Sequence, residues 1–514
     1  MTSPRGAELI EQDRSRLLGS MGLALFGQGG AFAFGLLCMV LTTRLLGPEG
    51  YGALAMFFLA LAVLSQVVMS WPNLGLVRFG RAELAERGGV AGSFWARVAI
   101  FLVTLPAAGG LLWIFRAPLE RWLGLGFAPH LILLAYLGLN EAAFLCRGVF
   151  QTTSRFRAYA LSNTLVKLFI FAGLALLYLW SRAPGRQAGA LSVLNVHLWA
   201  LGLALGVCLL LLPWRLLRPA RLEGAQAARI LRYSWPLMLG GLSIFVVDWV
   251  DVAVIKHFRS GPEVGLYMAA YQPVTVLSQL RIAGIAALLP LVISMAVEKR
   301  HASLSWFLDD AMPQAAWGIG LLCTLAAGLA ELIPLVMGEK FAPSVVPAQV
   351  LMAGVAFSML GAVQTALAQA FGRVRAAAAV VAALALLNIL GDLLLVPLLG
   401  ILGAAVATSV AFALSGLLYF PIVNGIAPLR TEARDRRYLA LAGLLPALLF
   451  AILAVCLDSP AQRTIACAAV LLAALPAAKM IGVFKRSTLE RLESVRMPER
   501  ALGMLRRFYA VMGR

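Results

Sequence analysis

Charged residues are scarce in this sequence. Asp, Glu, Lys and Arg together make up 13% of it, against 61% for the apolar residue types. Soluble globular proteins usually carry about 25% charged and about 45–50% apolar residues. The apolar residues form long runs, such as 161–180, 193–213 and 376–399, and a helix needs roughly 20 such residues to cross a bilayer. The composition therefore excludes a soluble multi-domain protein.

The motifs of common enzymes are also missing. The sequence contains no GxxxxGK[ST] phosphate loop, no GxSxG nucleophile turn and no HExxH metal site. Its six cysteines stand singly in or beside apolar runs without a CxxC pair, which is typical of small buried apolar residues and excludes a disulfide framework or a metal site. They are Cys38, Cys146, Cys208, Cys323, Cys456 and Cys467. We therefore expect no enzymatic activity, no metal and no cofactor.

The net charge is +19, yet the basic residues lie in short loops between the apolar runs. Such a pattern reports the orientation of spans in a membrane and contact with anionic lipid headgroups. No basic and aromatic groove motif accompanies it, so nucleic acid is not an expected partner.

The sequence predicts an all-α polytopic membrane protein with about fourteen transmembrane helices. A polar segment, 1–17, precedes the first span, which is too long for a signal peptide. The predicted spans are 18–46, 51–76, 95–115, 129–149, 157–180, 191–213, 233–258, 265–296, 311–337, 344–372, 375–399, 401–427, 438–457 and 463–484.

Lys and Arg alternate between rich and poor loops along these spans. Because positively charged loops stay in the cytoplasm, both termini are expected on the cytoplasmic side of a bacterial inner membrane. The loops assigned to that side contain Arg78, Arg81, Arg87, Arg147, Arg155, Arg157, Arg215, Arg218, Arg221, Arg229, Arg232, Lys299, Arg300, Arg373, Arg375, Arg430, Arg434, Arg436 and Arg437.

Three short matches indicate an internal duplication. Gly-Pro-Glu occurs at 47–49 and 261–263, Arg-x-Arg-Ala at 155–158 and 373–376, and Gly-Ala at 189–190 and 403–404. The offsets between the copies are nearly equal, since 261 − 47 = 214, 373 − 155 = 218 and 403 − 189 = 214. They predict an N-lobe over 18–213, a basic cytoplasmic linker over 214–232 and a C-lobe over 233–427. Six spans per copy give a parallel repeat, with two further spans in 438–484.

The C-terminal segment 485–514 repeats Lys and Arg among Leu, Met, Phe and Tyr. This pattern favours a cytoplasmic amphipathic helix lying on anionic lipid. A solvated tail is the alternative.

Six ionisable residues lie well inside predicted spans, where a charge is costly and tends to face a cavity: Glu141, Lys167, Asp248, Asp251, Arg281 and Asp392. Arg281 is the main candidate for gripping a phosphate, because a guanidinium binds phosphate bidentately and keeps its charge. It could instead pair with a carboxylate. Lys167 supplies a second positive charge, or pairs with Glu141.

The remaining acidic residues have two interpretations each. Asp248 and Asp251 are three residues apart on one helical face, so together they bind a proton or a sodium ion, or else neutralise Arg281. Glu141 and Asp392 follow Asn140 and Asn388 closely, and each lines a substrate cavity or anchors an interhelical hydrogen bond.

Four segments resemble bacterial polysaccharide flippases of the multidrug, oligosaccharidyl-lipid and polysaccharide exporter superfamily. TRLLGPEGYG at 43–52 is similar to their first-helix signature. DVAVI at 251–255 followed by GLYMAAY at 265–271 resembles their seventh-to-eighth-helix junction. GEKF at 338–341 resembles an outer-loop motif, and GILGAAVAT at 400–408 a twelfth-helix motif.

This resemblance implies a two-lobed transporter of twelve or fourteen helices. It implies a flippase that moves an undecaprenyl-diphosphate-linked oligosaccharide from the cytoplasmic to the periplasmic leaflet for O-antigen, exopolysaccharide or capsule assembly, beside glycan polymerase and assembly proteins. Arg281, Lys167, Glu141 and Asp392 would then contact the substrate, with proton or sodium coupling through the acidic pair.

Four alternatives remain open at this point. A cation-coupled multidrug exporter and a lipid II flippase share the fold, although the first helix here has only Arg44, at its outer end, where lipid II flippases carry more basic residues. A glycan polymerase or ligase requires larger outer loops than these. A non-transporting scaffold is the fourth alternative.

Overall fold

The computed structural model describes residues 4–126, 128–218, 224–297, 301–426, 438–485, 488–489 and 499–513. Within them, the side chains of residues 4–29, of most of 237–248 and of most of 282–302 lie outside the description. The chain divides into two compact units, Met1–Phe245 and Val246–Arg514. Every regular element in the described part is helical, since helices satisfy their own backbone hydrogen bonds in hydrocarbon.

Unit 1 is built around four mutually packed helices, with α1 against α6, and α5 and α6 against α7. A buried cluster of Leu76, Phe94, Val149, Phe150 and Leu217 joins α2, α3 and α5 near one end. The elements are α1 (Pro4–Leu64), a π-helical turn (Ser65–Met69), α2 (Pro72–Arg87), α3 (Ala91–Ile114), α4 (Arg116–Leu123), α5 (Pro129–Thr152), α6 (Phe156–Ser181), α7 (Ala190–Leu211) and the first part of α8 (Gly224–Phe258).

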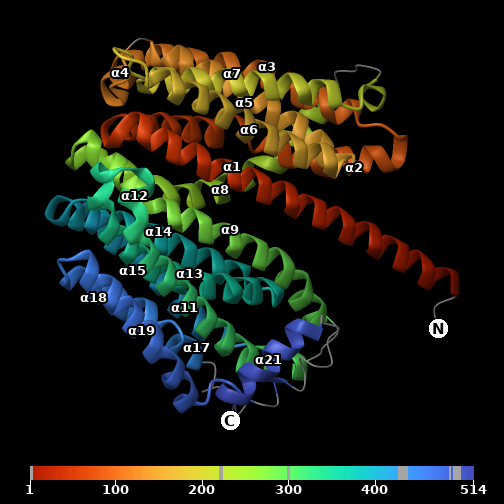
Figure 1. Ribbon diagram of the computed structural model, residues 1–514. Coiled ribbons are helices and arrows are strands. Elements are labelled where there is room, and N and C mark those ends of the chain that lie inside the picture. The colour runs from red at the N-terminus through yellow and green to blue at the C-terminus, as the bar shows by residue number, and fades with distance from the viewer. Residues whose placement is uncertain are drawn as a thin grey trace. The chain divides into compact units, whose positions relative to one another are not determined.

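Unit 2 is centred on α13, whose residues are mostly buried and which packs against α9, α11, α15 and α18 (Figure 1). The elements that follow α8 are α9 (Gly261–Val297), α10 (His301–Trp306), a π-helical turn (Phe307–Ala311), α11 (Met312–Leu329), α12 (Ile333–Met337), α13 (Val345–Ala370), α14 (Val374–Leu399), α15 (Ile401–Asn424), α17 (Leu439–Ala442), α18 (Leu445–Cys456), α19 (Pro460–Ile481) and α21 (Glu499–Met512).

Eleven helices among the described residues are long and apolar enough to span a membrane. The prediction of an all-helical polytopic membrane protein is therefore confirmed. The predicted spans 233–258 and 265–296 fall in α8 and α9, many of whose side chains lie outside the description. Lys299, Arg300 and residues 427–437 also lie outside it, so the count of fourteen and the loop orientation stay predictions.

The first two predicted spans meet at a kink inside α1. Gly47 has φ 61° and ψ −174°, a conformation that is essentially restricted to glycine. Pro48 follows and cannot donate a backbone hydrogen bond to the preceding turn. The Gly-Pro pair of the repeat motif therefore kinks the chain between two helical segments of α1.

The loops that precede α6 and α14 have the same hydrogen bonds, at the offset that separates Arg155 from Arg373. Backbone N–H groups of 153, 154 and 155 donate to the carbonyls of 149, 151 and 150, and those of 371, 372 and 373 donate to 367, 369 and 368. The same offset relates the first and last residues of Phe156–Ser181 to those of Val374–Leu399, and each helix is 26 residues long. The two loops thus share one hydrogen-bonding pattern and precede helices of equal length, and the duplication of a six-helix unit stays a prediction.

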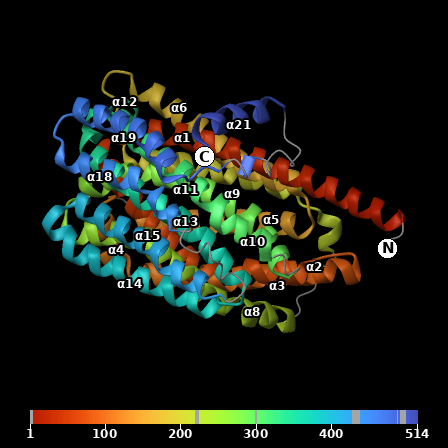
Figure 2. The same cartoon turned by 90° about the horizontal axis from the view of Figure 1, so that it is seen from below.

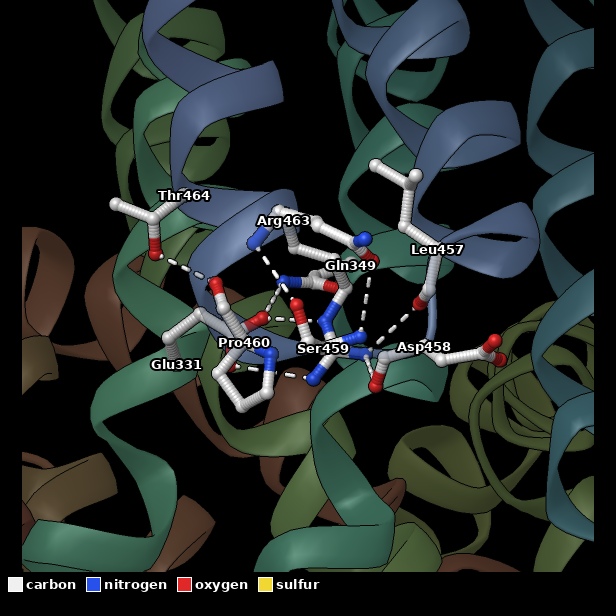
Figure 3. A network of polar contacts seen from close by, with 9 residues as sticks. Glu331, Gln349, Leu457, Asp458, Ser459, Pro460, Arg463 and Thr464 are labelled. Atoms are coloured by element: carbon white, nitrogen blue, oxygen red, sulfur yellow. Dashed lines mark hydrogen bonds and ion pairs between the residues drawn. The ribbon is translucent and has the colours of Figure 1, made fainter.

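The two helices beyond the duplication, α18 and α19, lie along α11 in both views (Figures 1 and 2). A buried network fixes them there (Figure 3). Arg463 of α19 pairs with Glu331, with Nε 2.6 Å from Oε1, and donates from Nη1 to the carbonyls of Leu457 and Asp458 at 3.0 and 3.2 Å. Gln349 of α13 donates to the same Glu331 oxygen at 2.8 Å.

Breaking this pair should weaken the attachment of α18 and α19. We expect Arg463→Met to lower the free energy of unfolding by about 3 kcal/mol, because it leaves the Glu331 carboxylate buried without its cation. Replacing both partners, as Arg463→Met with Glu331→Leu, should restore most of that loss. Unfolding in mixed micelles, followed by circular dichroism, measures both.

Lys340→Met is the matched control, because Lys340 is an exposed cation in the same unit. A loss of stability in Arg463→Met no larger than in this control would contradict the structural role of the pair.

Candidate functional site

The carboxylate of Asp251 on α8 is buried in unit 2, the residue being 1% exposed. It accepts hydrogen bonds from three side chains of three other helices. Asn388 Nδ2 of α14 lies 2.7 Å from Oδ1, Thr408 Oγ1 of α15 lies 2.7 Å from Oδ2, and the hydroxyl of Tyr267 on α9 donates to Oδ2. All three partners are buried, so Asp251 joins four helices at one point.

A second carboxyl group lies beside the first. Asp392 follows Asn388 by one turn of α14, is fully buried, and is within electrostatic reach of Asp251. Apart from the neighbouring Asp251 carboxyl, the carboxyl oxygens of Asp392 have no hydrogen-bond partner among the described residues, and Oδ1 of Asn388 has none there. Two neighbouring carboxyl groups are costly in a buried site unless a cation or a proton compensates them.

The backbone explains why these side chains meet. Gly391 lies against α15, where an added Cβ would stand 2.9 Å from the Cβ of Ala407, so glycine permits the close approach that brings Asp392 toward Thr408. At the end of α14, Arg259 donates from Nη2 to the carbonyls of Val396 and Pro397 at 3.1 and 2.7 Å. These bonds satisfy helix-terminal carbonyls and hold the end of α8 against α14.

This arrangement has the chemistry of a site for a proton or a small hard cation. It offers carboxylate, amide and hydroxyl oxygens, the ligand types that hard cations prefer. The described residues contain no group of three or more His, Cys, Asp or Glu suited to a metal ion. Two adjacent buried carboxyl groups either share a proton or bind a cation between them.

The duplication provides an internal comparison for this site. At the offset that relates Arg155 to Arg373, Asn388 and Asp392 correspond to Ile170 and Leu174 of α6, which are 2% and 0% exposed. Gly391 corresponds to Gly173, which approaches α7 at Val196 as closely as Gly391 approaches α15. The fold therefore accepts apolar side chains at both positions, and packing does not require the amide and carboxyl groups in unit 2.

Unit 1 has its own buried polar cluster, around Glu141 of α5. The Ser65 hydroxyl donates to Glu141 Oε1, and Arg97 Nη2 of α3 lies 3.6 Å from Oε2. Arg97 Nε donates to Asn73 Oδ1 at 3.2 Å, and Asn73 Nδ2 donates to the carbonyl of Phe144 at 2.8 Å. Both Glu141 and Arg97 are fully buried, so this cluster joins α2, α3, α5 and the π-helical turn internally.

The structure brings together only some of the predicted site residues. It unites Asp251 with Asp392, which the sequence placed in separate roles. Lys167 is exposed on α6, Arg281 is half-buried on α9, and the side chain of Asp248 lies outside the described residues. The roles predicted for these residues and for Glu141 stay predictions.

Besides Ser65 and Asn73, sequence reasoning missed three members of the two clusters. Tyr267 and Thr408 are uncharged, so a search for ionisable groups in spans passes over them, although both stand in the motifs at 265–271 and 400–408. Arg97 lies near the end of a predicted span, where a charge needs no partner. A signal for all three exists only in the contacts between helices.

Comparison with known proteins agrees with this architecture. Residues 17–296 match the family described as polysaccharide biosynthesis protein. No curated protein sequence matches the chain. Among solved structures, a lipid II flippase, MurJ, in an inward closed conformation has a TM-score of 0.63 at 14% identity, covering 88% of this chain and 97% of its own.

Two other structures of the superfamily are similar. An inward-facing multidrug resistance MATE transporter has a TM-score of 0.62 at 13% identity over 80% of this chain and 96% of its own. A transporter from Pyrococcus furiosus, whose binding pocket is described as having reverse polarity, has a TM-score of 0.50 at 16% identity over 80% of this chain and 95% of its own. The family match covers more than half of the chain, which therefore belongs to the polysaccharide biosynthesis protein family and has the fold shared by MATE transporters and MurJ.

Proposed function

We propose that this protein is a flippase for an undecaprenyl-diphosphate-linked oligosaccharide, moving it from the cytoplasmic to the periplasmic leaflet by alternating access. Membership in the polysaccharide biosynthesis family is the observation that carries the proposal. The product would serve O-antigen, exopolysaccharide or capsule assembly. Transport of this kind makes and breaks no covalent bond, which agrees with the lack of an enzyme motif in the sequence.

The proposed transporter has fourteen spans. Twelve of them form two six-helix lobes in parallel repeat, and α18 and α19 are the other two. The loops before α6 and α14 share one pattern of backbone hydrogen bonds, which supports the repeat. An even number of spans per copy gives both copies the same orientation, and rocking of such copies alternates access to a central site. Because the network around Arg463 fixes α18 and α19 to unit 2, these helices are proposed to move together with the C-terminal lobe.

In this proposal the substrate diphosphate is held by cationic side chains within the spans. Arg281 on α9 is half-buried, and Lys167 on α6 is exposed. A guanidinium suits a diphosphate because its fork of donors matches two phosphate oxygens. Glu141 is buried against Arg97 and Ser65, which supports a role for it in joining the helices of unit 1.

The energy for transport is proposed to come from a proton or sodium gradient through Asp251 and Asp392. The sequence pointed to Asp248 as the partner of Asp251. The buried geometry adds Asp392 as a candidate partner, because its carboxyl group lies beside that of Asp251. Binding of a cation would draw α8 and α14 together, and its release would leave two like charges that repel.

A cation-coupled multidrug exporter is the second candidate, favoured by the similarity to MATE transporters and by the same carboxyl pair. A lipid II flippase is a third, favoured by the similarity to MurJ. The three candidates differ in the molecule that accumulates when transport stops.

Mass spectrometry of lipid-linked intermediates in depleted cells tests the substrate. We expect one undecaprenyl diphosphate glycan to accumulate, and a wild-type copy to relieve it. An Arg281→Ala copy should transport at least about tenfold more slowly, since a charge-assisted hydrogen bond contributes about 1.5–3 kcal/mol. Arg281→Lys, which keeps the charge, should retain part of the activity.

An unchanged lipid pool together with lost resistance to small toxic molecules would contradict the flippase and favour the multidrug exporter. Accumulation of lipid II alone would favour the third candidate.

Exchanging Asn388 and Asp392 for their counterparts in the other copy tests the cation site. We expect Asn388→Ile with Asp392→Leu to fold with undiminished thermal stability, because buried charges are often replaced by apolar residues without loss. The wild type should be stabilised by sodium or by protons, by about 2.7 kcal/mol at a hundredfold excess over Kd. The exchanged protein should lose that dependence.

Thermal unfolding of both proteins across sodium concentrations and pH measures the effect. Asp458→Asn is the control, because Asp458 is exposed outside the spans. An exchanged protein with the same cation dependence as the wild type would contradict the assignment of the site.

A further inference from the structure

The C-terminal helix α21 lies across the end of the helices of unit 2 (Figure 1). One of its faces is fixed to the bundle. Tyr509 and Met512 are 4% and 7% exposed and belong to one buried cluster with Ala474 and Ala478 of α19 and with Trp317 of α11. The Tyr509 hydroxyl also donates to Gln314 of α11. One face of α21 is therefore covered by the bundle, and the lipid contact of its other face stays a prediction.

A second face of α21 is apolar and exposed. Met504, Phe508 and Val511 are 68%, 38% and 64% exposed. At about 100° per residue, these three side chains form one narrow stripe, because they are four and three residues apart. The stripe lies about a quarter of a turn from the face that carries Tyr509 and Met512.

The position of α21 relative to the spans indicates what the stripe contacts. The cluster that holds it contains Ala474 and Ala478 in the last turns of α19, which ends at Ile481. The helix thus lies beside the end of α19, where that span reaches the membrane surface. A face turned a quarter of a turn from the bundle there meets the boundary between headgroups and acyl chains.

Cations surround the stripe. Arg506 and Arg507 are exposed on α21, and Lys479 is exposed in the last turn of α19. Long basic side chains beside an apolar stripe can reach phosphate groups while their stems cover apolar surface. This combination fits an anionic bilayer surface better than a protein partner, because an interface core is depleted of charged residues.

We propose that α21 is an in-plane membrane helix, with Met504, Phe508 and Val511 inserted among the acyl chains and Arg507 bound to anionic headgroups of the leaflet that α19 reaches. The surface is independent of the transported substrate and of the cation site. It attaches the start of α11 and the end of α19 to the lipid surface.

Spin labels on the full-length protein in vesicles test this proposal. Cys456 is the exposed cysteine among the six, so Cys456→Ala supplies a background in which a label at Met504→Cys or Ala510→Cys dominates. Ala510 is an exposed residue of α21 away from the stripe. We expect the label at 504 to collide with oxygen and to be shielded from a water-soluble relaxant, and the label at 510 to show the reverse.

The lipid charge provides the second readout. Adding phosphatidylglycerol to phosphatidylcholine vesicles should deepen the label at 504, and Arg507→Gln should weaken that response about fivefold, as expected for one basic residue near an anionic surface. Hydrogen exchange of the unmodified protein should slow over 499–512 with phosphatidylglycerol. This measurement covers the case that a labelled variant fails to fold.

Two results would overturn the proposal. Equal exposure of 504 and 510 to the water-soluble relaxant in both vesicles would leave α21 in solvent. Shielding of 504 from both relaxants would mean that a protein surface covers the stripe.

Discussion

Each polar group buried in this protein must find its partner inside the chain, because hydrocarbon offers no hydrogen bonds. The three buried polar clusters follow from this constraint. Arg463 with Glu331 and Gln349 fixes α18 and α19 to unit 2. Arg97 with Glu141 joins the helices of unit 1. In the third cluster, around Asp251 and Asp392, two carboxyl groups lie beside each other, and the side chains that donate to Asp251 are all uncharged. The first two clusters instead pair a carboxylate with a guanidinium, and this difference supports the proposal of a cation or proton site at the third.

The duplication makes this distinction sharper than burial alone would. The two copies keep the same loop hydrogen bonds and the same close helix approach at Gly173 and Gly391. They differ in what stands beside that approach, which is Leu174 in one copy and Asp392 in the other. A residue pair needed for packing would be expected in both copies. The carboxyl group in only one of them agrees with the proposed role in transport.

Much of the fold could be predicted from the sequence, because long apolar runs and basic loops report spans directly. The likeness of two loops was also visible, since Arg155 and Arg373 each precede a helix of the same length. The junction between the first two predicted spans was visible in the Gly-Pro pair, since Gly47 has non-helical backbone angles between two helical segments. The sequence indicated only part of the candidate site. Asp251 and Asp392 stand out as charges in apolar runs, but their pairing joins two helices that are distant in the sequence, which no local pattern reports.

The most direct test of the account is the flipping of a fluorescent lipid-linked diphosphate glycan in proteoliposomes with an imposed sodium or proton gradient. The account predicts that one of the two gradients accelerates flipping by the wild type, and that Asp251→Asn abolishes this acceleration while leaving binding of the glycan intact. Flipping by the wild type that ignores both gradients, or an Asp251→Asn protein that still responds to one, would contradict cation coupling at the buried carboxyl pair.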